Sequence, residues 1–314
     1  MSDVVLLDGG MGMELLQRSA NKTPRLWSAD YLLSEPELVT TLHRDFIDAG
    51  ACVVTTNSYS ASYTRMATVG MHDQVPMLQE RACELAIKAR DQSGQARVAI
   101  AGCLPPLNGT YRPDRVRNFE ENLEEYARLA ALQAPYVDLF ICETMSTAQE
   151  ARAAAQAATT HNKPVWVSWS LQDQAPRLRS GESIEDAYGA LAGLPIGAVL
   201  VNCCPPESIS QAMKSLVATG LAAGGYANGF VSIPLTFLPG KTREQLLSRT
   251  DLGPSEYAVF GNAWIDRGAT IIGGCCEVGP AHIRAMRDQL LQQGHSIRSP
   301  LDPATHPYKD GRNP

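Results

Sequence analysis

Short runs of β-branched and apolar residues alternate along the chain with longer stretches whose apolar positions recur at helical spacing. The clearest such stretch covers residues 36–49, where Leu38, Leu42 and Phe46 recur every fourth position and mark one face of a helix. Pro36 opens this stretch and Gly50 follows it, which is the usual asymmetry of helix ends. The same pattern predicts further helices at 75–90, 119–134, 147–160, 184–192, 207–218, 254–267 and 280–292. The short apolar runs predict strands at 4–7, 53–56, 98–102, 139–142, 165–169, 198–201, 222–227 and 270–273.

Eight predicted strands, each followed by a helix, fill the chain without a break in composition. Alternation of this kind indicates a parallel sheet, and eight units predict a single closed (β/α)8 barrel, the TIM-barrel fold. A doubly wound open sheet is the alternative, but the dinucleotide fingerprint G-x-G-x-x-G fails because Leu15 stands where its last glycine belongs. We therefore expect one α/β domain over residues 1–293, followed by a tail rich in proline and polar residues over 294–314.

The charge balance is acidic, with 27 Lys and Arg against 33 Asp and Glu in 314 residues and a formal charge of −6. Nucleic-acid-binding domains usually carry a basic footprint, so this balance argues against such a partner. No apolar run approaches the roughly 18 residues of a membrane span, and the first residues lack the basic flank of a signal peptide. We therefore expect a cytoplasmic protein that acts on small molecules; the sequence indicates no particular oligomeric state.

The eight cysteines include two adjacent pairs, Cys203-Cys204 and Cys275-Cys276, and each pair directly follows a predicted strand. A chain of this length can bury a stable core without disulfides, and thiols stay reduced in the cytoplasm. We therefore expect free thiols rather than disulfides. The active site of a (β/α)8 barrel lies at the carboxyl ends of its strands, so pairs separated by 72 residues (275 − 203) can meet at one mouth. The other predicted strand ends carry further polar, thiol or aromatic groups: Asp8, residues 55–57, Cys103, Glu143, Trp169 and Asn228.

The cysteine pairs predict a zinc site. Three thiolates around Zn²⁺ with an open fourth position form a catalytic type of site, whereas structural sites are closed by four protein ligands. Gly273 and Gly274 let the backbone bend so that Cys275 and Cys276 both face one ion. Such a zinc ion is a poor centre for hydrolysis, but it holds a substrate thiol as a thiolate, which suits alkyl transfer to sulfur.

A longer series of motifs, running from residue 6 to residue 276, resembles the homocysteine S-methyltransferases. That zinc-dependent barrel family includes enzymes that use betaine, S-methylmethionine or cobalamin. The matching motifs are Leu6-Leu7-Asp8-Gly9-Gly10-Met11-Gly12, Leu26-Trp27-Ser28-Ala29, Thr55-Thr56-Asn57-Ser58-Tyr59, Cys142-Glu143-Thr144, Val201-Asn202-Cys203, Tyr226-Ala227-Asn228 and Ile272-Gly273-Gly274-Cys275-Cys276. The resemblance implies transfer of a methyl group from a small onium donor to the thiol of homocysteine, giving methionine, and hence a place in methionine biosynthesis.

The resemblance also implies which residues hold the metal. The family's zinc ligands fall on Cys203, Cys275 and Cys276, which leaves Cys204 as a neighbour rather than a ligand. Asn228 matches an asparagine that approaches the zinc ion when no substrate is bound.

Contacts to homocysteine are implied in the same way. Asp8 and Glu143 fall on the positions that bind its ammonium group, and Gly9 and Thr55 fall near its carboxylate. Two carboxylates at strand ends attract an ammonium group and fix its direction. The alternative is a cap on the glycine-rich turn for Asp8 and an internal charge pair for Glu143.

Aromatic residues indicate where the methyl donor would bind. Tyr59 matches the family's tyrosine near the transferred methyl group, and Trp27 and Trp169 are further candidates to flank a donor cation. The stretch around Trp27 favours S-methylmethionine or S-adenosylmethionine. Betaine is less favoured, because Thr144 stands where betaine-using relatives have an aromatic residue.

Two rival interpretations remain at this stage. One keeps the barrel and the zinc ion but changes the acceptor thiol or takes the methyl group from a corrinoid protein, which could dock on the loop at 103–117. The other is a non-catalytic zinc or redox thiol protein, which predicts four protein ligands or reversible disulfides. The acidic Glu277, directly after Cys276, departs from the family pattern and has no assigned role.

Overall fold

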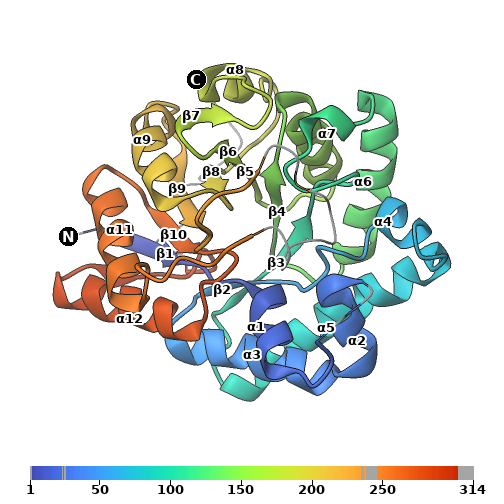
Figure 1. Cartoon of the computed structure of the whole chain (residues 1–314), viewed down its shortest axis with the longest axis horizontal. Coiled ribbons are helices and arrows are strands. Elements are labelled where there is room, and N and C mark those ends of the chain that lie inside the picture. Colours follow the sequence, from blue (N-terminus) through green and yellow to red (C-terminus); the bar gives the residue numbers. More distant parts are fainter. Residues whose placement is uncertain (1, 23, 25, 235–236, 238–245, 303–314) are drawn as a thin grey trace.

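The centre of the computed structural model, which describes residues 2–22, 24, 26–234, 237 and 246–302, is a curled sheet of parallel strands (Figure 1). Eight strands form it: β1 (Asp3–Leu6), β2 (Val53–Thr55), β3 (Ala99–Leu104), β4 (Leu139–Met145), β5 (Val165–Trp169), β8 (Ala198–Asn202), β9 (Ala222–Ala227) and β10 (Ile271–Gly274). They pair in the order β1-β10-β9-β8-β5-β4-β3-β2, so each strand neighbours the next barrel strand along the chain.

The barrel closes between its first and last strands in this order. Leu7 and Val53 form a parallel bridge. Backbone hydrogen bonds flank it, from the Asp8 N–H to the Val53 carbonyl (3.1 Å) and from the Cys52 N–H to the Leu6 carbonyl (2.8 Å). The predicted (β/α)8 barrel is therefore confirmed, and all eight predicted strands are present with ends displaced by up to three residues.

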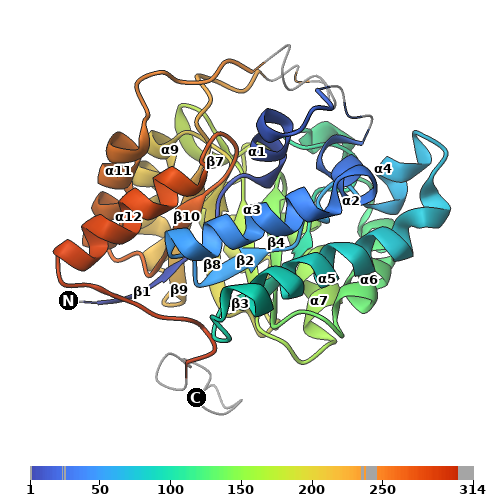
Figure 2. The same ribbon diagram turned by 90° about the horizontal axis from the view of Figure 1, so that it is seen from below.

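Helices surround the barrel (Figures 1 and 2). α3 begins at Pro36 and ends before Gly50, whose φ of 115° is accessible to glycine without strain. The short helices α1, α2 and α4 were not among the predicted elements, because a helical period does not show over so few residues. The helices are α1 (Met11–Arg18), α2 (Asp30–Ser34), α3 (Pro36–Ala49), α4 (Tyr63–Ala67), α5 (Val75–Ser93), α6 (Phe119–Gln133), α7 (Ala148–Thr159), α8 (Ile184–Gly189), α9 (Pro206–Val217), α11 (Pro254–Asp266) and α12 (Pro280–Gln292).

Two hydrophobic clusters hold the fold together. The larger one lies between the strands and the helices. The other fills the inside of the barrel with mostly small and medium side chains: Leu7, Val53, Ala99, Ala101, Leu139, Ile141, Trp166, Ala198, Leu200, Tyr226 and Ile271. β9 and β10 approach so closely that a Cβ atom on Gly224 would fall 1.6 Å from the Ile271 carbonyl oxygen. The barrel is thus a packed core whose chemistry is confined to its ends.

Three features differ from the predicted pattern or extend it. β6 (Leu171–Gln172) and β7 (Ala175–Leu178) form an antiparallel hairpin after β5, too short for alternation to reveal. β11 (Ser296–Ile297), in the predicted tail, pairs with β1 and extends the sheet; residues 303–314 of that tail lie outside the described residues. Among the described residues, no helix combines the length and apolar character needed to cross a bilayer.

Candidate active site

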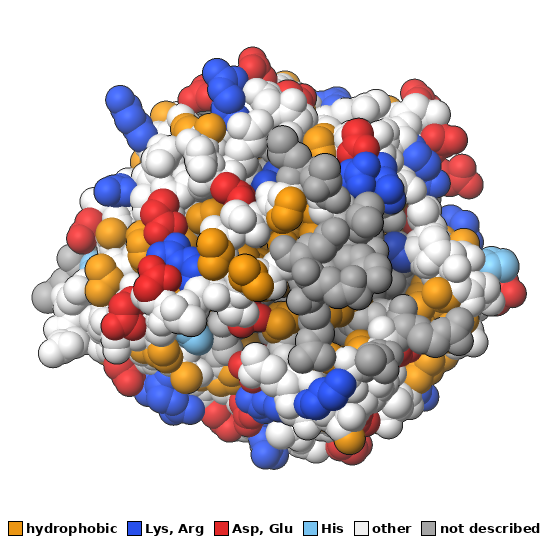
Figure 3. Space-filling view, in the orientation of Figure 1, with side chains coloured by type: hydrophobic (Ala, Val, Ile, Leu, Met, Phe, Trp, Pro, Cys, Tyr) orange, Lys and Arg blue, Asp and Glu red, His pale blue; other side chains and the backbone are white. Residues whose placement is uncertain are grey.

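A cavity opens at the carboxyl ends of the strands. Described parts of the segment between β9 and α11 cross above this end of the barrel (Figure 2). Hydrophobic side chains gather around the centre of the face shown in the space-filling view (Figure 3). All of the predicted site residues except Asn228 and Trp169 line the cavity. The residues that form its chemistry are Asp8, Gly9, Trp27, Thr55, Tyr59, Arg65, Thr110, Tyr111, Glu143, Cys203, Cys275 and Cys276.

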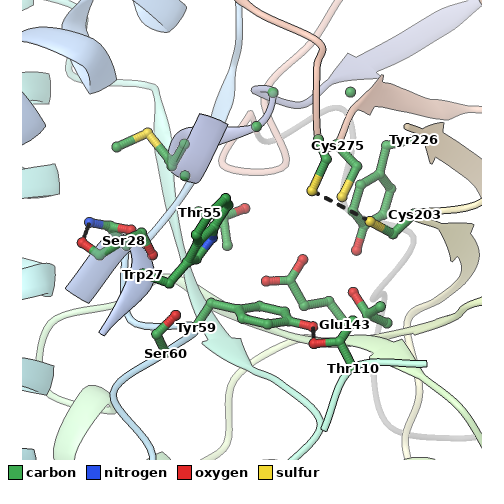
Figure 4. Close-up of a pocket in the computed structure, with 18 of the residues that line it drawn as sticks. Trp27, Ser28, Thr55, Tyr59, Ser60, Thr110, Glu143, Cys203, Tyr226 and Cys275 are labelled. Atoms are coloured by element: carbon green, nitrogen blue, oxygen red, sulfur yellow. Dashed lines mark hydrogen bonds between the residues drawn. The ribbon is translucent and has the colours of Figure 1, made fainter. Parts of the chain in front are cut away.

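Three sulfur atoms meet on one side of this cavity (Figure 4). The Sγ atoms of Cys203, Cys275 and Cys276 all lie within 4.8 Å of one another, and those of Cys203 and Cys276 are 3.8 Å apart. A tetrahedral zinc ion with bonds of about 2.3 Å sets its sulfur ligands about 3.8 Å apart, so the trio fits such an ion. Among the described residues, no fourth His, Cys, Asp or Glu joins this cluster. Cys204 is buried apart from it, in the hydrophobic layer under the helices.

The backbone and neighbouring side chains set up this thiol cluster. Cys203 follows β8 with a left-handed φ of 51°. Hydrogen bonds from Cys275 and Cys276, and a further one from Tyr111, hold the pKa of Cys203 well below its usual value. The Tyr111 hydroxyl lies 2.8 Å from the Cys203 Sγ. These contacts favour the thiolate form of Cys203, which is the form that binds metals.

Two carboxyl groups face the same cavity. Asp8 accepts hydrogen bonds from the Thr55 N–H (2.8 Å) and, at 3.4 Å, from the Thr55 hydroxyl. The Cys103 thiol donates to the Glu143 carboxyl group at 2.8 Å. Burial raises the pKa of Asp8 to about 8 and that of Glu143 to about 7. An ammonium group placed beside them would favour their charged forms, since an opposite charge nearby lowers a carboxyl pKa.

The Thr55 amide has a partner within the protein. Its N–H points to Asp8 rather than into open space for a substrate carboxylate. Gly9 lies against the segment after β10, where a Cβ atom would fall 2.1 Å from the Val278 carbonyl oxygen. A side chain at this position would collide with that segment, so glycine is required, and Gly9 lines the cavity.

Aromatic residues form the opposite part of the wall. The Trp27 ring lies over Gly12, where a Cβ atom would fall 2.4 Å from the indole nitrogen. Tyr59 reaches toward Thr110, with 2.9 Å between the two hydroxyl oxygens (Figure 4). The Arg65 guanidinium lies 5.1 Å from the centre of the Tyr59 ring.

Three residues considered at the sequence level lie away from the cavity. Trp169 is fully buried among the side chains under the helices, so the expectation that it flanks a donor is wrong. Asn228 is also fully buried, and its side-chain oxygen accepts from the Phe230 N–H at 3.1 Å. Glu277 is absent from the cavity wall and faces a separate surface hollow beside Met13 and Lys22.

Tyr111 and Arg65 are site residues that the sequence did not single out, whereas Cys103, at the end of β3, was among the predicted strand-end groups. Tyr111 falls within the loop at 103–117, which was expected at this end of the barrel, but nothing in the spacing says which of its residues turns inward. Tyr111 has a left-handed φ of 62°, a strained conformation that marks functional loops.

Comparison with known proteins agrees with this site. The homocysteine S-methyltransferase family matches residues 5–290. The chain belongs to this family of methyltransferases. Homocysteine S-methyltransferase of Escherichia coli is 31% identical over 91% of this chain and 94% of its own length. Selenocysteine Se-methyltransferase of Brassica oleracea is 25% identical over 96% and 92%. The metallated form of the homocysteine methyltransferase MmuM from Escherichia coli superposes with a TM-score of 0.77, at 29% identity and 92% and 96% coverage.

Proposed function

We propose that the enzyme transfers a methyl group from a small onium donor to the thiol of homocysteine, with the reaction centred on zinc held by Cys203, Cys275 and Cys276. The observation that carries the proposal is that the sulfur of Cys203 meets those of Cys275 and Cys276, which begin 72 residues further along the chain (275 − 203), beside two carboxyl groups in one cavity. Zinc bound there would hold the substrate thiol as a thiolate at neutral pH. The spacing of the sulfurs supports zinc, and the metallated relative supports a metal.

The chain's own residues would bind and orient homocysteine. Asp8 and Glu143 bind the ammonium group, and the Thr55 amide holds Asp8 in place for this contact. The backbone at Gly9 is open to the substrate carboxylate. The thiol of Cys103 orients Glu143. These contacts aim the substrate sulfur at the thiol cluster shown beside Glu143 in Figure 4.

The aromatic side of the cavity would receive the donor. Trp27 and Tyr59 present ring faces and edges to the cavity, and aromatic faces attract onium cations. A carbon–sulfur bond forms between the methyl carbon and homocysteine as the bond to the donor breaks. The electron pair of the broken bond leaves with the donor, which becomes neutral at that atom, and the thiol proton goes to solvent. S-Methylmethionine and S-adenosylmethionine are the favoured donors, and betaine is the less favoured one.

Two measurements test this proposal together. Zinc content is determined for C203A, C275A and C276A, with C204A as the matched control, because Cys204 is buried outside the cluster. We expect zinc to be lost from the first three variants and retained by C204A. Unaltered zinc in all three would contradict the proposed ligands.

Methionine formation from homocysteine is then assayed with S-methylmethionine, S-adenosylmethionine, betaine and methylcobalamin. Activity with a sulfonium donor is the expected result. Activity with methylcobalamin alone would favour the corrinoid alternative, and no activity with any donor would favour a non-catalytic thiol protein. Selenocysteine belongs in the same assay as a second acceptor, because a relative is named for it.

The proposal also concerns location and organisation. Free thiols at the cluster require a reducing compartment, so a cytoplasmic enzyme of methionine biosynthesis fits the chemistry. Residues 1–293 would form the homocysteine-binding catalytic domain and residues 294–314 the tail. Both statements remain predictions.

A further inference from the structure

Arg65 is a cation in the cavity wall that the proposed reaction does not yet use. It lies in the first turn of α4, after the capping residue Ser62. Helical side chains point back toward the start of their helix, which directs Arg65 to the loop at 105–110. There its guanidinium donates to the Pro106 carbonyl oxygen, from Nη2 at 2.7 Å and Nε at 3.2 Å, and to the Thr110 hydroxyl at 3.2 Å.

No carboxylate among the described residues forms an ion pair with this guanidinium, although thirteen arginine and lysine ion pairs occur between other residues of the described part of the chain. The contacts that hold Arg65 are neutral: one carbonyl, one hydroxyl and the face of the Tyr59 ring. They fix its position without neutralising its charge. The buried Glu150 interacts with Arg65 electrostatically but does not form an ion pair with it. A half-buried guanidinium that lines a cavity without an ion-pair partner favours an anionic ligand there, because an unpaired charge is costly to bury.

The position of Arg65 in the cavity indicates which part of a ligand its guanidinium would bind. Thr110 accepts from Arg65 and also contacts the Tyr59 hydroxyl, while the next residue, Tyr111, contacts the Cys203 sulfur. Arg65 is therefore separated from the sulfurs by the aromatic wall that would flank the donor. In Figure 4, Glu143 points into the cavity between the sulfurs and the Tyr59–Thr110 pair. Arg65 contacts Thr110 and the Tyr59 ring, so it lies on the side of the cavity proposed for the donor.

The geometry points to Arg65 as the binding residue for the carboxylate of the methyl donor, which makes the preferred donor a sulfonium that carries an amino-acid carboxylate. This inference rests on the proposed methyl transfer. A guanidinium matches a carboxylate through parallel N–H donors. The Nη1 group, which makes no hydrogen bond to the described residues, remains available for it. Arg65 would thereby select between donors with the same reacting methyl group.

A pair of donors that differ only in the carboxylate tests this inference. The first is S-methylmethionine, and the second is its decarboxylated counterpart, (3-aminopropyl)dimethylsulfonium. We expect wild-type kcat/KM to favour S-methylmethionine by roughly 10- to 100-fold, the range for a hydrogen-bonded charge. In R65Q this preference falls to near one, whereas R65K, the matched variant that keeps the charge, retains part of it. Thermal unfolding of each variant shows that it is folded.

Direct binding gives a readout that does not depend on turnover. Isothermal titration of the wild-type protein with the two sulfonium compounds should show the same preference, and R65Q should lose it. A preference that is unchanged in R65Q would overturn the inference. So would a rise in KM for homocysteine that lowers kcat/KM equally with both donors, because this would assign Arg65 to the acceptor.

The same experiments separate failure of this inference from failure of the proposed function. If wild-type protein forms methionine with both donors and R65Q keeps the wild-type ratio, only the role of Arg65 is wrong. If the wild-type protein forms no methionine with any donor, the proposed function fails. The titrations then still decide whether Arg65 is a carboxylate site for a sulfonium compound.

Discussion

Replacing Asp8 by asparagine is expected to stabilise the protein while impairing substrate binding. Burial raises the pKa of Asp8 to about 8 from its ordinary 3.8, so the folded chain holds a proton that the unfolded chain releases at neutral pH. A carboxyl group of this kind contributes stability that is complete below pH 3.8 and is lost as the pH rises to 8. D8N keeps the shape of the side chain and an acceptor for the Thr55 N–H, but it has no proton to lose.

The size of the effect follows from the shift. At pH 7 the group lies 3.2 units above its ordinary pKa (7 − 3.8), which corresponds to about 4 kcal/mol of unfolding free energy. This is an upper bound because the site can relax, and we expect D8N to gain about 1–3 kcal/mol at pH 7. The gain should fall below about 1 kcal/mol at pH 4, which lies close to the unfolded-state pKa of 3.8, so the unfolded carboxyl group is ionised only in part.

Urea unfolding of reduced, metal-free protein at pH 4, 5.5, 7 and 8 measures this gain. D48N provides a matched control, because it makes the same substitution at an exposed position. In the same variant, kcat/KM for homocysteine should fall roughly 10- to 100-fold, as one of two ammonium-binding carboxylates is lost. Equal stability of D8N and wild type at pH 7 and 8, or a gain that does not increase with pH, would refute the reasoning.

Three further predictions concern other parts of the molecule. Wild-type kcat/KM for homocysteine should rise with pH through about 7 as Glu143 deprotonates, and a pH profile of E143Q should lack that inflection. His43 is fully buried with its pKa lowered to about 4, so lowering the pH from 7 to 5 should cost about 2 kcal/mol of stability in urea melts, a loss absent from H43L. G224A should unfold at lower temperature because its Cβ meets the Ile271 carbonyl, whereas G189A, with open space, should not.

Much of the barrel could be predicted from the sequence, because its signals are local. Eight apolar runs separated by amphipathic stretches suffice to define the units, and strand ends of a parallel barrel necessarily meet at one mouth. The same reasoning predicts that the segments containing Cys203 and Cys275 lie close together. It did not find the β6–β7 hairpin, whose strands contain two and four residues.

The residues that the sequence did not reveal lie on a short helix and a loop. Arg65 enters the cavity because Ser62 caps a five-residue helix that aims it backward, and Tyr111 enters because one residue takes a left-handed φ. Neither event leaves a periodic pattern. Trp169 was misplaced for the opposite reason: it ends a strand, but side chains alternate along a strand, and this one faces the helices.

Thr110 and Tyr111 are neighbours in one loop, yet the first contacts Arg65 and the second contacts the Cys203 sulfur. An insertion or deletion in this loop would therefore alter the choice of donor and the environment of the metal at the same time. During divergence of related enzymes, a new donor preference acquired through this loop would come with a changed metal affinity. Donor preference and metal affinity would therefore change together, because they depend on adjacent residues of the same loop.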